Sequence, residues 1–205
     1  MILAVEGIDG AGKNTLVRAL LKHIDAETLS FPRYSTSDAA KLARKALYGR
    51  MGDMTESPYA MAALFALDRA GAREYLQKFA ASQDTILILD RYVASNAAYT
   101  AARLEDMDAA QWVYDLEYGD LGLPKPVLQI LLETPTSVAQ ERAESRARAE
   151  RDRAKDTYEQ DGGLQTRTAA AYRRLARGQW ASPWLIVPHT TTPQEATEEV
   201  LNRLV

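Results

Sequence analysis

The chain has 205 residues, of which 46% are hydrophobic and 26% charged, with a formal net charge of -3 and no cysteine. These values are ordinary for a globular protein, and we expect one domain over residues 1–205 with a large buried core. The small net charge gives no reason to expect a nucleic-acid partner. The absence of thiols excludes disulfides, thiolate metal sites and a cysteine nucleophile, and it suits a reducing cytoplasm.

The first apolar run, Ile2–Val5, is short and is followed by Glu6. No basic leader precedes it, and no run approaches the roughly 20 apolar residues that cross a membrane. We therefore expect neither a signal peptide nor a membrane helix, and a cytoplasmic location.

Five short apolar runs, separated by helical patterns, indicate the strands of an α/β fold. The runs are Ile2–Val5, Thr28–Phe31, Thr85–Leu89, Val127–Leu132 and Trp184–Val187. Each is short enough to be a strand buried on both faces. Leu16, Leu20 and His23/Ile24 recur at helical spacing after the first run, and Tyr59–Phe79 is a long segment rich in Ala and Leu. This alternation predicts a five-stranded parallel sheet flanked by helices on both faces, with ligands at the carboxyl ends of the strands.

A glycine-rich turn follows the first predicted strand and opens the first predicted helix. It fits the first seven places of the P-loop pattern G-x-x-x-x-G-K-[ST], whose backbone N–H groups, helix dipole and lysine bind phosphates. A dinucleotide-binding pattern would instead require glycine at Thr15. The turn therefore predicts a site for the phosphates of ATP, formed by Gly7, Ile8, Asp9, Gly10, Ala11, Gly12, Lys13, Asn14 and Thr15.

Asn14 stands where the general motif places a Ser or Thr hydroxyl on magnesium. Either Thr15 supplies that oxygen, or Mg²⁺ is held mainly by phosphates, water and carboxylates such as Asp9 and Asp90. The sequence leaves both arrangements open, and Mg²⁺ is the expected cofactor in both.

The third predicted strand leads into Asp90-Arg91-Tyr92. In a parallel sheet this places a carboxylate and a guanidinium at the same edge as the P-loop. Asp90 can orient water bound to magnesium, and Arg91 can bind phosphate oxygens bidentately, which lysine cannot do. The alternative interpretation is an ordinary surface ion pair at the end of a strand.

With these residues the chain begins to resemble a known family. Four motifs occur in order: Gly7–Lys13, Phe31-Pro32-Arg33-Tyr34, Phe65-Ala-Leu-Asp-Arg69, and Asp90-Arg91-Tyr92 followed by Ser95-Asn96-Ala-Ala-Tyr99. Together they resemble the bacterial-type thymidylate (dTMP) kinases over nearly the whole chain. The resemblance implies a P-loop NTPase fold of the nucleoside monophosphate kinase type. It also implies a homodimer that transfers the γ-phosphoryl group of ATP to dTMP, with Mg²⁺, in dTTP synthesis.

The resemblance assigns roles in the acceptor site as well. Phe65 would stack on thymine, Arg69 would donate to its O4, and Asn96 would bind its N3 edge. Tyr99, on the same helix face as Asn96, would crowd the 2′ position of the sugar and favour deoxyribose. The implied dTMP-binding residues are Phe31, Pro32, Arg33, Tyr34, Phe65, Arg69, Arg91, Ser95, Asn96, Tyr99 and Tyr158.

Selection among nucleotides follows from these roles. The resemblance places Arg33, Tyr34 and Arg91 around the 5′-phosphate, and Asp9 near the 3′-hydroxyl and the metal. Cytosine carries an amino donor where Arg69 also donates, a mismatch that can cost a factor of about 10,000. Uracil lacks only a methyl group, worth roughly 1–3 kcal/mol. We therefore expect strong rejection of dCMP and moderate rejection of dUMP.

A charged segment at about residues 141–159 corresponds to the family's arginine-rich lid over ATP. Its basic residues are Arg142, Arg146, Arg148, Arg151, Arg153 and Lys155. Arginines delivered by closure can stabilise the charge of the transferring phosphoryl group while water is excluded. The expected catalytic residues are Lys13, Asp9, Arg91, Arg151 and Arg153, and Glu159 is expected near the metal. The interleaved acidic residues leave open a solvated, salt-bridged helix instead.

Two other functions fit part of the sequence. A deoxynucleoside kinase shares a P-loop and an acidic residue beside arginine, but it needs a carboxylate base where Phe31–Tyr34 offers arginine and tyrosine. A nucleotide-binding protein without turnover is suggested by Asn14. His23 and His189 are expected to be packing or surface residues, because phosphoryl transfer depends on binding and electrostatics and requires no histidine base.

Overall fold

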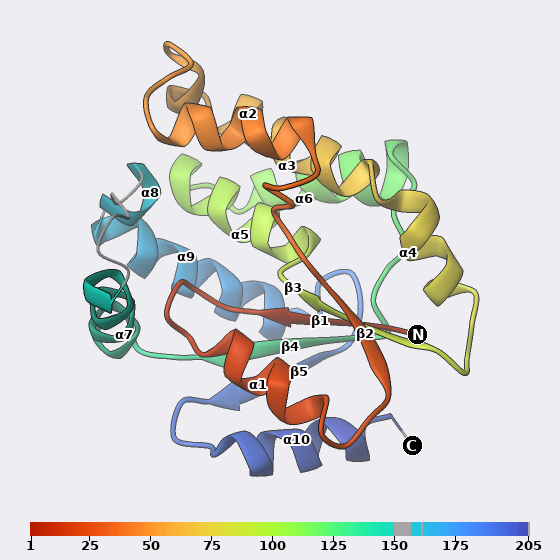
Figure 1. Cartoon of the computed structure of the whole chain (residues 1–205). Helices are drawn as coiled ribbons and strands as arrows, with labels where there is room; N and C mark the ends of the chain where they lie inside the picture. The colour runs from red at the N-terminus through yellow and green to blue at the C-terminus, as the bar shows by residue number, and fades with distance from the viewer. Residues whose placement is uncertain (150–156, 161, 205) are drawn as a thin grey trace.

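The computed structural model describes residues 1–149, 157–160 and 162–204. A parallel sheet runs through the middle of the molecule, with helices above and below it (Figure 1). Its strands are β1 (Ile2–Glu6), β2 (Ala26–Ser30), β3 (Ile86–Asp90), β4 (Leu128–Glu133) and β5 (Trp184–Pro188), in the spatial order β2-β3-β1-β4-β5. The expected α/β fold is confirmed, and each strand lies within two residues of its apolar run.

Helices lie on both sides of the sheet. They are α1 (Lys13–Leu20), α2 (Asp38–Leu47), α3 (Pro58–Ala70), α4 (Arg73–Ala80), α5 (Val93–Leu104), α6 (Asp108–Tyr114), α7 (Thr136–Ala149), α8 (Thr157–Gln160), α9 (Gly162–Arg177) and α10 (Pro193–Asn202), with a 3-10 turn at Met54–Glu56 and a π-helical segment at Asp115–Asp120. α1 and α10 cover one face of the sheet, and α4, α5, α6 and α9 cover the other (Figure 1).

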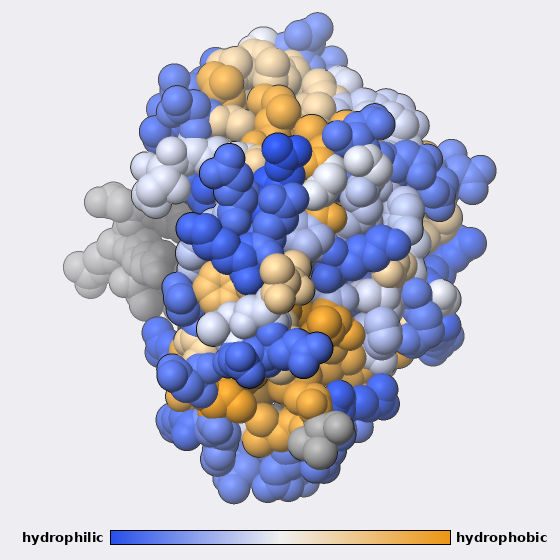
Figure 2. Space-filling view, turned by 90° about the vertical axis from the view of Figure 1, so that its right-hand side faces the viewer, coloured by the Kyte–Doolittle hydropathy of each residue, from blue (hydrophilic) through white to orange (hydrophobic). Residues whose placement is uncertain are grey.

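The face shown in Figure 2 is mostly hydrophilic, with apolar residues gathered near the upper end of the molecule, at the level of α2 and α3, and again in its lower half. In the part of the chain that the structure describes, no helix has the length and apolar character needed to cross a membrane.

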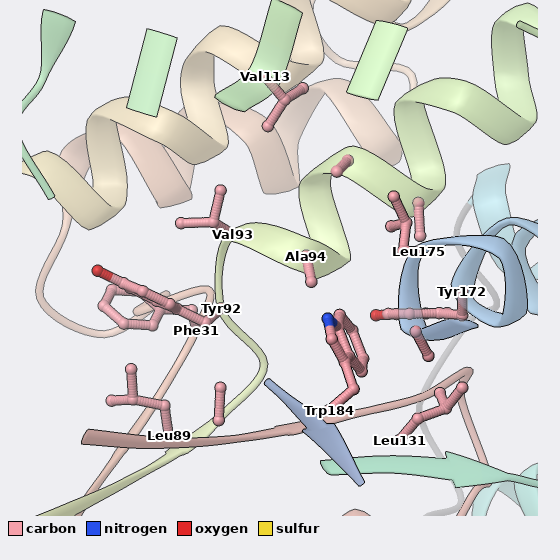
Figure 3. Close-up of a cluster of buried hydrophobic side chains, with 14 of the residues drawn as sticks. Phe31, Leu89, Tyr92, Val93, Ala94, Val113, Leu131, Tyr172, Leu175 and Trp184 are labelled. Carbon is pink, nitrogen blue, oxygen red and sulfur yellow. The ribbon is translucent and has the colours of Figure 1, made fainter. Parts of the chain in front are cut away.

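Apolar side chains form a core on each face of the sheet. Tyr92 and Trp184 belong to the larger core, which Figure 3 shows between the sheet and the helices. Successive residues of β1 enter opposite cores: Ala4 packs on the α5 side and Val5 on the α1 side. Because β1 is buried along its whole length, the loop that follows it starts from a fixed position.

β2 corrects the expectation that every strand is buried on both faces. None of its five residues is buried, whereas all five residues of β1 are. The reason is its position at the edge of the sheet, where β2 pairs only with β3. A short apolar run does not distinguish an edge strand from a central one.

Two expected helices end earlier than the patterns suggest. α1 ends at Leu20, so His23 lies beyond the helix and is exposed rather than on its apolar face. The segment Tyr59–Phe79 is divided into α3 and α4 at Gly71, a residue that disfavours the interior of a helix. His189 is exposed after β5, as expected.

The register of the sheet brings three chain segments to one edge. Val5 of β1 lies beside Asp90 of β3 and Ile130 of β4. The backbone N–H of Arg91 donates to the carbonyl of Val5 at 3.0 Å. The glycine-rich loop, Arg91 and the connection to α7 therefore leave the sheet side by side.

Candidate active site

The loop between β1 and α1 has the shape of an anion site. Gly10 and Gly12 have φ angles of +84° and +99°, which glycine adopts without strain. Gly12 is the N-cap of α1, so the positive end of the helix dipole faces the loop. The N–H of Ala11 donates to the carbonyl of Ile8 at 3.2 Å and closes the turn. The predicted phosphate loop thus has the conformation that its motif requires.

Gly10 also permits a close approach between the loop and α7. A Cβ atom at Gly10 would lie 2.0 Å from the carbonyl oxygen of Ala139, which is backbone and cannot move aside as a side chain can. The hydroxyl of Thr134 donates to the carbonyl of Ala11 at 3.2 Å and holds the same two segments together. The first turn of α7, which leads into the expected lid, is therefore packed directly on the loop.

Lys13 is buried at the centre of the loop, with 9% of its surface exposed. Its Nζ donates to the carbonyl oxygens of Gly7 at 3.2 Å and Ile8 at 3.1 Å. Burial lowers the pKa of Lys13 to about 8, and the Arg91 cation acts in the same direction against the opposing carboxylates. The ammonium is thus held by weak neutral acceptors, which phosphate oxygens can replace.

A cavity of about 780 Å³ opens in front of the loop. It is lined by residues 10–16 together with Arg18, Asp90, Leu132, Thr134, Glu141, Arg142, Ser145, Val187, Pro188, His189, Thr191, Pro193 and Ala196. The exposed side chains of Asn14 and Thr15 both border it. Arg142 on α7 is the lid arginine that lines this cavity in the described part of the chain.

Arg91 joins the phosphate loop to α5. Its Nη2 donates to Oδ1 of Asp9 at 2.7 Å, and its Nη1 donates to the Ser95 hydroxyl at 3.1 Å. The Tyr99 hydroxyl donates to the other oxygen of Asp9 at 3.1 Å. Although enclosure by protein acts to raise the pKa of Asp9, the cations of Arg91 and Lys13 outweigh it and hold that pKa below its usual value. Asp9 is therefore ionised at neutral pH.

The backbone of Arg91 is held in an uncommon conformation, with φ at +66°. A buried carboxylate, Glu6, organises its surroundings by accepting hydrogen bonds from the backbone N–H of Tyr92 at 2.7 Å, the Ser95 hydroxyl at 2.7 Å and the Tyr172 hydroxyl at 2.9 Å. Arg91 Nη1 also reaches the Tyr172 hydroxyl at 3.3 Å. Burial raises the pKa of Glu6 despite these bonds and the charge of Arg91. The guanidinium is thus oriented from two sides.

A second buried network lies between α3, α5 and the π-helical segment. Glu117 is fully buried and accepts hydrogen bonds from Nε and Nη2 of Arg69, the latter at 2.7 Å. Nδ2 of Asn96 donates to the same carboxylate at 2.8 Å and to the carbonyl of Ala62 at 3.0 Å. Burial acts to lower the pKa of Arg69, but Glu117 outweighs it and raises that pKa. Arg69 and Asn96 are therefore brought together, through a residue that no motif identified.

Tyr99, Phe65 and Tyr158 are the aromatic residues of the predicted acceptor site beyond Phe31 and Tyr34. The rings of Tyr99 and Tyr158 are stacked, with centroids 6.0 Å apart and planes inclined by 13°. Phe65 and Tyr158 both pack against the small apolar cluster that contains Met61. Arg103 donates to the Tyr158 hydroxyl at 2.7 Å and fixes its position.

The sequence and fold of this chain are similar to those of known proteins. The family model described as thymidylate kinase matches residues 5–200. This chain belongs to the thymidylate kinase family. A thymidylate kinase of Mycobacterium tuberculosis (strain H37Rv) is 49% identical over 201 residues, covering 94% of each chain. A probable thymidylate kinase of Methanospirillum hungatei is 29% identical over 197 residues, covering 95% of this chain and 88% of its own. A solved thymidylate kinase from Candida albicans, 21% identical, superposes with a TM-score of 0.76 over 99% of this chain and 90% of its own, which bears on the fold.

Among the thymidylate kinase motifs, Phe31-Pro32-Arg33-Tyr34 is the one least joined to the others. Phe31 is a core residue whose ring lies 6.0 Å from that of Tyr92. Pro32 follows it through a cis peptide bond. Arg33 pairs with buried Asp68 on α3, donating from Nε at 2.9 Å, and the Tyr34 ring lies under Arg44. The side chain of Arg33 therefore contacts α3, and the ring of Tyr34 contacts α2.

The remaining predicted residues are those of the lid and the metal site. Of these, Arg151 and Arg153 lie outside the described residues, as does the side chain of Glu159. No group of three or more metal-ligating side chains occurs among the residues described. Oδ1 of Asp90, however, is buried without a hydrogen-bond partner in the described part and borders the cavity, which fits a carboxylate that receives metal-bound water.

Sequence reasoning missed the residues behind the motifs. Glu6 ends an otherwise apolar strand, and that was a usable signal, because a carboxylate buried there demands partners. Glu117, Tyr172 and Arg103 lie on helical segments without a motif, so only their tertiary contacts identify them.

Proposed function

We propose that this protein transfers the γ-phosphoryl group of ATP to dTMP, giving dTDP and ADP, in the synthesis of dTTP. The observation that carries the proposal is the position of Arg91, whose guanidinium touches Asp9 of the phosphate loop and Ser95 of α5 at once. A cation in that place can contact phosphates bound on either side. Membership of the thymidylate kinase family supports dTMP as the acceptor.

In this mechanism the donor phosphates lie in the loop at the N-terminus of α1, where Lys13 exchanges two backbone carbonyls for phosphate oxygens. Arg91 uses three contacts to protein groups, which leaves further N–H donors for the 5′-phosphate of the acceptor. The acceptor oxygen is already ionised, so positioning and charge stabilisation suffice without a general base. Catalysis then depends on Lys13, Asp9 and Arg91.

The same site would hold Mg²⁺. When bound, the ion neutralises charge on the transferring phosphoryl group. Asp9 and Asp90, the latter through water, are the residues proposed to hold it, with Thr15 as a further oxygen on the cavity wall. Glu159 remains a proposed neighbour of the metal.

Recognition of thymidylate is proposed to use Phe65 for stacking, Arg69 and Asn96 for hydrogen bonds, and Tyr99 against a 2′-hydroxyl. The remaining proposed dTMP-binding residues are Phe31, Pro32, Arg33, Tyr34, Arg91, Ser95 and Tyr158. Support comes from the shared contact of Arg69 and Asn96 with Glu117 and from the half-buried ring of Phe65.

A coupled assay with dTMP, dUMP, dCMP, UMP and thymidine tests the proposal. We expect dTMP to be used best, dUMP moderately, and dCMP with kcat/KM lower by up to about 10,000-fold. Equal use of dTMP and dCMP would contradict it. Preferred use of thymidine would indicate a deoxynucleoside kinase, and ATP binding without ADP formation would indicate a protein without turnover.

We further propose a single domain over residues 1–205 with a lid at about 141–159, in which Arg151 and Arg153 act on the transferring phosphoryl group. Replacing Arg153 by alanine should lower kcat by about 100-fold while the Kd for dTMP changes little, because the charge acts in the transition state. Pre-steady-state turnover and calorimetric binding measure the two quantities. An unchanged kcat removes that role from Arg153.

A homodimer in the cytoplasm completes the proposal. Large apolar side chains are exposed on α3 and α6: Leu67 is 53% exposed and Tyr59 44%, and the Tyr59 ring lies 4.8 Å from that of Trp112. We expect Leu67→Lys to weaken the dimer by about 100-fold or more, because it would bury an unpaired charge. Light scattering after size exclusion measures the mass.

The control is Leu21→Lys, which alters a side chain of similar exposure just after α1, on the other face of the sheet. The control should leave the dimer intact. A wild-type protein that remains monomeric at millimolar concentration contradicts the proposal.

A further inference from the structure

Two buried carboxylates lie behind the site, and the mechanism above uses neither directly. Glu6 and Glu117 are both fully buried, and each accepts three hydrogen bonds. The donors to Glu6 lie around Arg91, on the side of the site that is proposed to bind phosphate. The donors to Glu117 belong to Arg69 and Asn96, on the side that is proposed to bind the base.

The contacts of Asn96 decide which way its amide points. Its Nδ2 lies 2.8 Å from the Glu117 carboxylate and 3.0 Å from the carbonyl of Ala62. Both partners can only accept hydrogen bonds, so exchanging Nδ2 and Oδ1 would set acceptor against acceptor twice. The amide therefore has one permitted orientation, with Oδ1 directed away from Glu117.

Arg69 is restricted in the same way. Glu117 takes both Nε and Nη2 in a bidentate pair, which leaves Nη1 as the outward end of the planar guanidinium. Within the described part of the chain, neither Nη1 of Arg69 nor Oδ1 of Asn96 has a hydrogen-bond partner, and neither is fully enclosed. The contacts with Glu117 thus leave one donor, Nη1 of Arg69, and one acceptor, Oδ1 of Asn96.

We propose that Glu117 is the positioning residue that sets the preference of this protein for thymine over cytosine. This inference rests on the proposed function, in which Arg69 and Asn96 meet the base. Thymine offers an acceptor at O4 beside a donor at N3, which matches Nη1 and Oδ1. Cytosine reverses both groups, so it meets donor against donor and acceptor against acceptor.

Glu117→Gln tests the role with little change in shape. The glutamine amide keeps one acceptor oxygen and adds two N–H donors, so three donors face one oxygen and either Arg69 or Asn96 loses its orientation. We expect the ratio of kcat/KM for dTMP to that for dCMP to fall by about 100-fold, mainly through a higher KM for dTMP, with kcat at saturation reduced less.

Glu6→Gln is the matched control, because it removes an equally buried carboxylate with three donors on the phosphate side. It should slow both nucleotides alike and leave the ratio unchanged. A folded Glu117→Gln protein with the wild-type ratio overturns the proposal, and so does an equal fall of the ratio in Glu6→Gln. If Glu117→Gln does not fold, Glu117→Asp carries the test, since it keeps the charge but shortens its reach. Its ratio must then lie below that of the wild type, and an unchanged ratio overturns the proposal.

The wild-type ratio separates this inference from the proposed function. A wild-type protein that does not prefer dTMP to dCMP contradicts the proposed function itself. A wild-type preference that survives in the Glu117 variants contradicts only the role of Glu117.

Discussion

Replacement of Lys13 by methionine is expected to lower kcat by about 1,000-fold, because the ammonium is a buried cation at the place where phosphate charge develops. Methionine fills a similar volume and removes only the charge and its hydrogen bonds. Thermal unfolding should show that the variant is folded, and its Kd for dTMP should change little. A kcat within tenfold of the wild type would contradict the assigned role.

The lowered pKa of Lys13 predicts a second measurable effect, a change of activity with pH. The free protein carries the ammonium below its pKa of about 8 and loses it as the pH rises through that value. The kcat/KM for ATP should therefore fall on the alkaline side, whereas kcat should not, because bound phosphates favour the charged lysine. In Lys13→Arg the alkaline fall should disappear, since arginine stays charged. A wild-type profile that is flat to pH 9.5 contradicts the assignment.

Arg91→Lys is expected to lower kcat/KM for dTMP by at least about 100-fold, although the charge is retained. Lysine is a point charge and cannot reach Asp9 and Ser95 together as the guanidinium does. Arg91→Met should cost more, since the charge is lost as well. Both substitutions keep a side chain with an unbranched Cβ at the position with φ of +66°, so the backbone is disturbed equally.

Nucleotide binding provides the control for Arg91. A non-hydrolysable ATP analogue is expected to bind the phosphate loop and not the acceptor site. Its Kd should therefore change by less than about tenfold in the Arg91 variants. If analogue binding is lost together with dTMP turnover, Arg91 acts on the donor site instead of joining the two sites.

Local patterns predicted the parts of the fold and site that depend on neighbours in sequence. The phosphate loop, the strand leading to Asp90 and the helix bearing Asn96 and Tyr99 are each continuous segments with a clear period or motif. Their contacts follow from the parallel sheet, whose carboxyl ends converge. The edge position of β2 depends on strand order, which no local pattern records.

The supporting residues depend on contacts between distant segments. Glu117 meets Arg69 across 48 positions, and Tyr172 meets Glu6 across 166. A single sequence holds no signal for such pairs, apart from the cost of burying Glu6 in an apolar strand. The role of Arg33 at the phosphate of the acceptor stays a prediction, and its contact with Asp68 on a distant segment is another one that the motif does not indicate.

The contact between Gly10 and Ala139 changes how sequence variation at the loop is interpreted. A glycine in a phosphate loop is usually explained by the ligand, yet any side chain at Gly10 would first collide with the backbone of α7. Selection at this position therefore acts on the packing of α7 against the phosphate loop as well as on nucleotide affinity. A variant library scored for folding alone, with no nucleotide present, should already be depleted of every substitution at Gly10, while Gly12, with only the tip of the Arg142 side chain nearby at 3.8 Å, should tolerate more.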